Sequence, residues 1–483
     1  MRVFIRNDRL APADAVAAIA IADARGETTL DLVASARVAA GTSAELTANG
    51  TLAGARPWSP NSPVLYTAVV RLKDPGGEVD SVQTRFGFRR VEATPEGLRL
   101  NGQPIFLTGF NRHEDSPRTA MAVDRQTTRE DLTRIKEAGA NFVRLCHYPH
   151  HPFELDLCDE IGLLVLDEIP LNLRIDAARA ETAARQIRRM IERDRNHPSV
   201  IFWSVGNETY DEDTFAAEAN RGLLRLAREL DPSRLCVHVS NRWRTSPNFE
   251  EDDVICVNDY PSMTGWRGRR GHGPQADLSR SAEAWRTSLA TLHERYPLKP
   301  ILISEFGYCS IAGTNGHALG EDMHERVIRA EFPALDAPFL CGVSLWCWAD
   351  HPWPPAGFLD GMAMSPFGVH TRQRVPKKAF GAIRSLYRAR QVVSAYPRIN
   401  RGQNLRPGRV LPSPTDTFAR AVLRWIRRNR PENRKNAMPG PAGGCRGGLH
   451  PNSAVFARKR GRSRVKVDSA RSARGRRGCL TTE

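Results

Sequence analysis

The apolar and polar residues of this chain follow two different rhythms. Up to about residue 95 they alternate, as in TTLDLVASARV (28–38), VLYTAVVRLKD (64–74) and SVQTRFGFRRVEA (81–93). Alternation is typical of strands with one buried face. The turn-forming clusters ANGTLAG, SPNSP and DPGGE separate these segments. Residues 1–95 are therefore predicted to form a small antiparallel β-sandwich.

From about residue 104 to residue 390, short apolar runs alternate with helical stretches such as RQTTREDLTRIKEAGA. That stretch has Thr127 three residues before Glu130, the spacing of a capping box, and Gly139 near its end. The eight apolar runs are IFLTGF (105–110), NFVRLCH (141–147), LLVLDE (163–168), VIFWSVGNE (200–208), LCVHVS (235–240), VICVNDY (254–260), ILISEFG (301–307) and GVSLWCW (342–348). Eight strand–helix repeats predict an α/β fold, a (β/α)8 TIM barrel over residues 96–395.

Polar residues stand where these apolar runs end. Barrel enzymes carry their active sites at the carboxyl ends of the strands, so these residues are candidates for one shared site. They are Asn111, Arg112, His113, Arg144, His147, Asp167, Glu168, Asn207, Glu208, Tyr260, Glu305, Trp346 and Trp348. Any one alone is compatible with a hydrogen-bonded rim residue, but seven strand ends that converge on one rim favour a site.

Glu208 and Glu305 say most about the chemistry. Each ends a long apolar run, where an ionised carboxylate is rarely left without a partner. Two such carboxyl groups suit hydrolysis of a glycosidic bond, in which one protonates the departing oxygen and the other attacks or stabilises the anomeric carbon. The fourth and seventh strands of a barrel face each other across its mouth. The pair can therefore approach the separation of about 5–5.5 Å used by retaining enzymes.

The net charge of +16 does not describe the body of the protein. From residue 401 on there are 21 Lys and Arg against 4 Asp and Glu, which leaves 49 against 50 in residues 1–400. A surface-wide basic patch is not supported. Residues 396–483 are rich in Arg, Gly, Pro and Ser and are predicted to be a disordered tail. Nucleic-acid binding is disfavoured except through that tail.

The nine Cys are scattered, with no CxxC pair and no Cys/His spacing suited to zinc, which indicates reduced and mostly buried thiols. The N-terminal MRVFIRNDRLAPADAV has no continuous apolar stretch like that of a signal peptide. No apolar run approaches the roughly 18 residues of a membrane span. We therefore expect a cytoplasmic protein with no membrane partner, and the sequence leaves homo-oligomer formation open.

Four segments together resemble glycoside hydrolase family 2, which includes β-galactosidases, β-glucuronidases and β-mannosidases. RPWSPNSPVLYTAVVRL followed by TRFGFRRVEA is similar to the end of the family's immunoglobulin-like domain. LTGFNRHEDSP and NFVRLCHYPHHPFELDLCDEIGLLVLDEIP are similar to its first three barrel strands. VIFWSVGNE resembles its acid/base segment and KPILISEFG its nucleophile segment. The resemblance covers about residues 55–390 and implies an immunoglobulin-like sandwich before the barrel.

The resemblance also implies residue roles. Glu208 becomes the general acid/base, protonated at the start, and Glu305 becomes the ionised nucleophile. The other implied site residues are Asn207 for the sugar 2-hydroxyl, Tyr260 and Arg144 beside the nucleophile, His113 and His147 for sugar hydroxyls, Trp346 as an apolar platform and Glu168 as a supporting carboxylate. Rim hydrogen bonding for the histidines and a core role for Trp346 are the alternatives.

Three departures from the family pattern bear on the substrate. Only about 95 residues precede the barrel, so the family's N-terminal jelly-roll domain is expected to be missing. MAMSP (362–366) stands where glucuronidases carry an Asn-x-Lys that holds the substrate carboxylate, which argues against a glucuronide. LNLR (171–174) replaces the metal-binding Glu-x-His of some β-galactosidases, so no metal and no cofactor are assigned.

These observations predict a retaining hydrolase of terminal β-glycosides, with a carbohydrate as its partner and β-galactosides as the first choice. A β-mannosidase or β-glucuronidase specificity stays open. So does a truncated, catalytically impaired barrel that binds carbohydrate without cleaving it.

Overall fold

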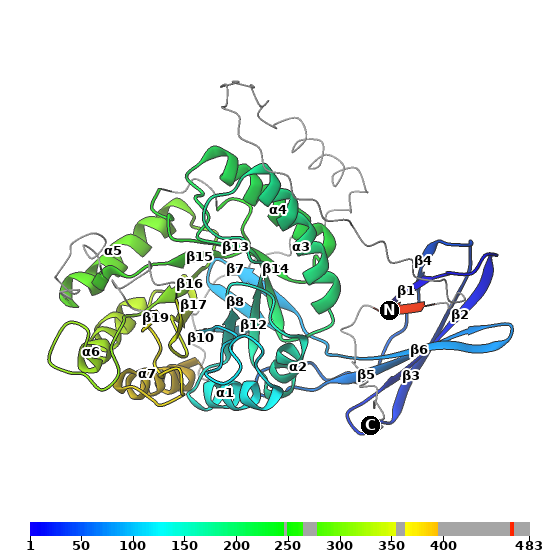
Figure 1. Ribbon diagram of the computed structural model, residues 1–483, viewed down its shortest axis with the longest axis horizontal. Helices are drawn as coiled ribbons and strands as arrows, with labels where there is room; N and C mark the ends of the chain where they lie inside the picture. The colour runs from blue at the N-terminus through cyan, green and yellow to red at the C-terminus, as the bar shows by residue number, and fades with distance from the viewer. Residues whose placement is uncertain (246–248, 264–277, 354–362, 395–463, 468–483) are drawn as a thin grey trace, which may run out of the picture.

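A computed structural model of the chain describes residues 1–245, 249–263, 278–353, 363–394 and 464–467. It shows a closed parallel barrel surrounded by helices, with a β-sandwich on one side (Figure 1). The predicted fold class, a TIM barrel preceded by an all-β region, is confirmed. Apart from residues 464–467, the tail predicted to be disordered lies outside the described residues.

The barrel strands follow one another in chain order, and the first pairs with the last. They are β10 (Leu107–Arg112), β11 (Phe142–Leu145), β12 (Leu164–Glu168), β13 (Val200–Asn207), β14 (Leu235–Ser240), β15 (Ile255–Asn258), β16 (Ile301–Phe306) and β17 (Leu340–Leu345). Each overlaps one of the predicted apolar runs. The runs are continuous rather than alternating because a parallel strand in such a fold is covered on both faces.

Helices pack on the outside of the barrel, as Figure 1 shows. They are α1 (Arg125–Glu137), α2 (Pro152–Ile161), α3 (Ala177–Asp194), α4 (Thr214–Leu230), α5 (Leu278–Arg295), α6 (Glu321–Glu331) and α7 (Lys378–Ser394), with 3-10 turns η1 (Pro261–Met263) and η2 (Phe332–Leu335). One apolar cluster joins strand residues such as Val143 to helix residues such as Leu132. Within the described residues, no helix is both long and apolar enough to cross a membrane.

The start of α1 differs from the prediction. Asp124 caps this helix and its Oδ1 accepts the N–H of Thr127 at 2.8 Å, so Thr127 lies inside the first turn. The expected capping box is therefore wrong, because an Asp, which caps at least as well as Thr, stands just before the helix. Gly139 does follow the helix end, at a φ of 91° that suits glycine.

A small antiparallel sheet covers the amino-terminal end of the barrel. It consists of β7 (Val91–Thr94), β8 (Gly97–Leu100) and β9 (Gln103–Ile105). Leu98 and Leu100 pack with Leu107 and Phe142 in the barrel interior. Figure 1 shows β7 and β8 across the middle of the barrel. The carboxyl ends of the strands, which carry the candidate residues, therefore lie at the other end of the barrel.

Two sheets form the sandwich. One has the order β3-β2-β5-β6, built from β3 (Thr28–Val38), β2 (Ala13–Ala22), β5 (Tyr66–Asp74) and β6 (Gly77–Phe86). The other has the order β20-β1-β4, built from β20 (Arg464–Val467), β1 (Arg2–Arg6) and β4 (Ser43–Thr47). Val3, Ile19 and Val70 meet in the core between the sheets. A further strand pair, β18 (His351–Pro352) and β19 (Met364–Ser365), follows the last barrel strand.

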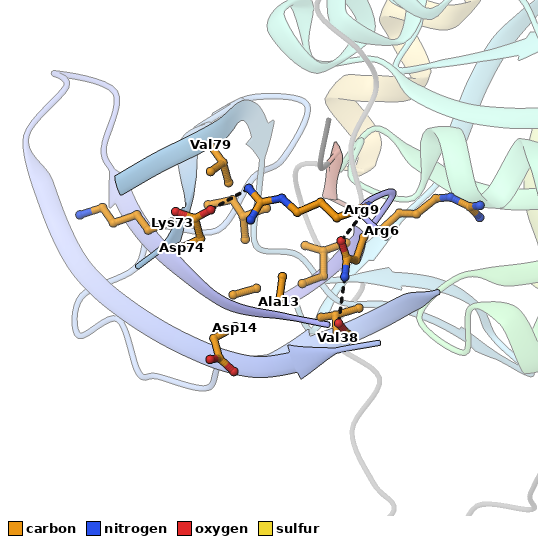
Figure 2. A pocket seen from close by; sticks show the side chains of 12 residues that line it. Arg6, Arg9, Ala13, Asp14, Val38, Lys73, Asp74 and Val79 are labelled. Carbon is orange, nitrogen blue, oxygen red and sulfur yellow. Dashed lines mark hydrogen bonds and ion pairs between the residues drawn. The ribbon is translucent and has the colours of Figure 1, made fainter. Parts of the chain in front are cut away.

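The sandwich holds a cavity of about 20 Å³ (Figure 2). Figure 2 shows Arg9 reaching Asp74, with 2.7 Å between guanidinium and carboxylate. The amide of Asn7 donates to the carbonyl of Val38 at 3.0 Å. A space of this size holds about one water molecule, so it is not a candidate site for an organic ligand.

Hydrogen bonds attach the sandwich to α2. Trp58 is fully buried and its Nε1 donates to the carbonyl of Asp159 at 2.9 Å. Arg85 reaches Asp156 and Glu160, each at 2.9 Å. Because Trp58 lies between β4 and β5 and Arg85 lies in β6, these contacts fix the sandwich beside the second strand–helix unit.

Candidate active site

Arg144 lies at the centre of the predicted residues. From β11 its Nη1 donates to Glu305 Oε1 at 2.6 Å, and its Nη2 donates to both oxygens of Glu168 at 3.0 Å and to Asn207 Oδ1 at 2.7 Å. Its side chain is fully buried. Burial alone would lower the pKa of Arg144, but Glu168 and Glu305 raise it. Arg144 is therefore a permanent positive charge that connects the ends of β12, β13 and β16.

Glu305, in β16, is held on both of its oxygens. Oε1 accepts from Arg144, and Oε2 accepts from the hydroxyl of Tyr260 at 2.7 Å. The backbone then turns sharply at Gly307, where φ is 154° and a Cβ would lie 2.5 Å from the carbonyl oxygen of Trp346. Only glycine allows this approach, so the EFG sequence both presents the carboxylate and brings β16 against the end of β17.

Glu208 directly follows β13 and lies in a different environment. Its backbone has a φ of 46°, and its N–H donates to the carbonyl of Val239 at 2.8 Å. Its Oε1 accepts from Asn258 at 3.0 Å and its Oε2 from Asn241 at 2.8 Å. Burial raises the pKa of Glu208, and the charge of Glu305 raises it further. The two carboxyl groups thus interact electrostatically, but among the described residues only Glu305 of the two has a direct cationic partner.

Glu168 is a third carboxylate of the site. Its Oε1 lies 2.8 Å from Nδ1 of His147, and its Oε2 accepts from Ser204 at 2.7 Å. Burial would raise the pKa of Glu168, but Arg144 and His147 lower it to about 2. Glu168 is therefore ionised and positions Arg144 and His147.

His113, His147 and Trp346 form one side of the mouth. The rings of His147 and Trp346 are stacked at 5.2 Å, and the ring of His113 meets Trp346 edge-on at 5.4 Å. Burial, together with the nearby His351 and His147, lowers the pKa of His113 well below 6.5. This wall therefore offers aromatic surface and an uncharged imidazole.

Other polar strand ends serve the scaffold instead. Arg112 is buried and pairs with Asp131 at 3.1 Å and Glu154 at 2.9 Å. The indole of Trp348 donates to Asp131 at 3.0 Å. Asp167 is buried, and burial together with Asp194 raises its pKa. Arg112 and Asp167 alternate with site residues along β10 and β12, so their side chains point the other way.

The sequence analysis missed two amides that position Glu208. Asn258, the last residue of β15, accepts from Ser304 at 2.8 Å and donates to Asn207 as well as to Glu208. Asn241 follows β14 directly. The position of Asn241 in the sequence could have revealed it. Asn241 follows the fifth barrel strand, the one strand of the eight for which the sequence analysis named no candidate.

Comparison with known proteins identifies the family. The profile described as glycosyl hydrolases family 2, TIM barrel domain, matches residues 91–332, half of the chain. The profile described as glycosyl hydrolases family 2 matches residues 1–89. The chain therefore belongs to family 2 of the glycosyl hydrolases.

Its relatives differ in their named substrates. It is 28% identical over 321 residues to a β-glucuronidase of Streptococcus agalactiae, covering 61% of this chain and 52% of that protein. It is 38% identical over 227 residues to a β-galactosidase of Enterobacter cloacae, covering 43% of this chain and 21% of that protein. The crystal structure of a family 2 β-galacturonidase from Eisenbergiella tayi bound to galacturonate has a TM-score of 0.71 and 26% identity, over 80% of this chain and 69% of that one. The chain spans about half or less of the length of these two curated relatives.

Proposed function

We propose that this protein is a retaining hydrolase of terminal β-glycosides, with Glu208 as the general acid/base and Glu305 as the nucleophile. The observation that carries the proposal is the unequal treatment of the two carboxyl groups. Glu305 is paired with Arg144 at 2.6 Å, whereas Glu208 has only amide donors among the described residues and a raised pKa. Environments that separate two carboxyl groups in this way are typical of an acid and a nucleophile.

The proposed reaction has two displacements. In the first, Glu305 attacks the anomeric carbon while Glu208 gives its proton to the departing oxygen, which leaves a glycosyl ester on Glu305. In the second, Glu208 takes a proton from water, the water attacks the same carbon, and the ester bond to Glu305 breaks. Tyr260 donates to the nucleophile throughout. Asn207 accepts from Arg144 and Asn258 through its Oδ1, so its amide is oriented to offer Nδ2 to a sugar hydroxyl.

For the substrate we propose a neutral sugar, with β-galactosides first. A uronic acid requires a cation for its carboxylate, and Arg144 is already committed to Glu168 and Glu305. Lys377 is 3% exposed and bonds Asp350 at 2.8 Å. The uronidases among the relatives make a β-uronide the alternative to be tested, together with a β-mannoside.

A panel of p-nitrophenyl β-glycosides, including galactoside, mannoside, glucuronide and galacturonide, tests both parts. We expect hydrolysis that is fastest on the galactoside. Hydrolysis that is fastest on a uronide would reject the neutral-sugar assignment while supporting the enzyme. Binding of sugars without turnover of any member would support the impaired, carbohydrate-binding barrel.

Variants test the two roles. Glu305→Gln removes the nucleophile with almost no change in shape, so turnover of the best substrate should be lost. Glu331→Gln is the matched control, because Glu331 is also buried but bonds the indole of Trp285 on the outer helices. Glu208→Ala should be partly rescued by azide on a substrate with an activated leaving group. Full activity of Glu305→Gln, or no rescue of Glu208→Ala, would refute the corresponding role.

A further inference from the structure

Three metal-ligating side chains converge on the aromatic side of the mouth. His113 follows β10, and Cys146 and His147 follow β11. One nitrogen or sulfur atom from each lies within 4.8 Å of the other two. Sequence spacing gave no sign of this group, because His113 lies more than thirty residues from Cys146 and no CxxC pair is present.

The rings are oriented as metal-binding histidines usually are. In such sites the second ring nitrogen hydrogen-bonds to a carboxylate, carbonyl or water, which fixes the ring and its tautomer. Here Nδ1 of His147 lies 2.8 Å from Glu168, and Nδ1 of His113 lies 3.3 Å from the hydroxyl of Tyr148. Nε2 of His113 is buried and has no hydrogen-bond partner among the described residues. Trp346 contacts both rings and limits their rotation.

We propose that His113, Cys146 and His147 bind a thiophilic divalent cation of the Zn²⁺ class, and that the bound ion blocks the proposed glycosidase site. One sulfur and two imidazole nitrogens match Zn²⁺, Co²⁺ and Cd²⁺, and they are poor ligands for Mg²⁺ or Ca²⁺. The two imidazoles are half-buried, whereas the thiol is buried.

Binding changes the state of Cys146. Its Sγ–H now donates to the carbonyl of Arg112 at 3.2 Å. When the sulfur–metal bond forms, the S–H bond breaks and the proton passes to solvent, so the cysteine binds the ion as a thiolate.

The position of the ion predicts inhibition rather than catalysis. Nε2 of His147 lies 4.0 Å from Oε1 of Glu305. An ion on that nitrogen therefore stands beside the proposed nucleophile and attracts its negative charge. It also occupies the wall proposed to bind sugar hydroxyls. This second half of the proposal rests on the proposed function, whereas the binding site itself does not.

Cobalt provides a readout that is independent of activity. The full-length protein, freed of metal with EDTA, is titrated with Co²⁺ and followed by absorption. We expect a thiolate-to-cobalt charge-transfer band in the parent and its loss in Cys146→Ser. Cys309→Ser is the matched control, because Cys309 is a buried thiol of the same apolar cluster and is not one of the three ligands. His113→Gln should weaken Zn²⁺ binding at least about tenfold. No band in the parent, or an unchanged band in Cys146→Ser, would overturn the site.

Inhibition is then measured with the best glycoside. Zn²⁺ should inhibit the parent and Cys309→Ser equally, EDTA should reverse the inhibition, and Cys146→Ser should need at least about tenfold more Zn²⁺. Equal inhibition of the parent and Cys146→Ser would overturn the blocking role. A cobalt band in a protein that hydrolyses no glycoside would reject the proposed function and support the metal site.

Discussion

His238 holds a positive charge between two buried carboxylates, and its replacement should change how stability depends on pH. Its Nδ1 lies 2.9 Å from Asp252 and its Nε2 lies 3.2 Å from Asp211, and all three side chains are buried. Asp211 is three residues beyond Glu208 in the chain, and the neighbour of His238, Val239, accepts the N–H of Glu208. The charge therefore supports the loop that carries the proposed acid/base.

The size of the expected change in stability follows from the pKa shift of His238. Burial would lower the pKa of His238, but Asp252 and Asp211 raise it from 6.5 to about 10. A group whose pKa is raised on folding stabilises fully below its unfolded pKa, and that stability is lost as the pH rises through the folded pKa. Between pH 6.5 and about 10 His238 carries one proton more in the folded protein than in the unfolded chain. The contribution of His238 to the free energy of unfolding should then fall by about 1.4 kcal/mol per pH unit, in total by about 5 kcal/mol.

Denaturant unfolding of the parent and His238→Gln across this pH range measures the difference. The variant should lose about 3–5 kcal/mol at neutral pH, because the cation of a buried ion pair is removed. Its stability should also lack the one-proton decline above pH 6.5.

His324→Gln is a control in which the pKa of the buried histidine is shifted in the opposite direction. Burial lowers the pKa of His324 well below 6.5. The parent therefore loses stability from this group as the pH falls below 6.5, and the control should change only that acid side. If the parent and His238→Gln lose stability with the same alkaline slope, His238 does not carry the proposed charge.

Two further predictions concern the proposed active site. Arg144→Met leaves the buried Glu168 and Glu305 without their cation, so it should lower the free energy of unfolding by about 3–5 kcal/mol, measured by denaturant titration. A loss within the range of ordinary surface substitutions would contradict the central place given to Arg144. Asn258→Ala removes a hydrogen bond that lowers the pKa of Glu208, so the alkaline limb of the kcat/KM profile should move to higher pH. A move to lower pH would contradict the acid role of Glu208.

The barrel could be predicted because its signal is local. Each strand is covered on both faces and so appears as an unbroken apolar run. The strand β2 was not singled out, although its sequence ADAVAAIAIA alternates. Much of its outward face is alanine, so the contrast between its two faces is weak. The capping of α1 by Asp124 instead of Thr127 shows that boundaries depend on competition between neighbouring residues.

The candidate site could be predicted only as a set of strand ends. Which of these ends contact one another depends on distances across the barrel that no sequence spacing contains. Arg144 and Arg112 illustrate this, because both are arginines at strand ends. One connects Glu168 to Glu305, whereas the other pairs with Asp131 and Glu154 behind the strands. The contacts of Asn258 and the grouping of His113 with Cys146 likewise require the folded barrel.

Trapping of the glycosyl-enzyme tests the central claim most directly. A 2-deoxy-2-fluoro β-glycoside of the preferred sugar, with an activated leaving group, slows the second displacement and lets the ester accumulate. Mass spectrometry of the digested protein should then find one sugar on the peptide that contains Glu305, and none in Glu305→Gln. A sugar on another carboxylate, or substrate hydrolysis in which this inhibitor never forms an ester, would contradict the account.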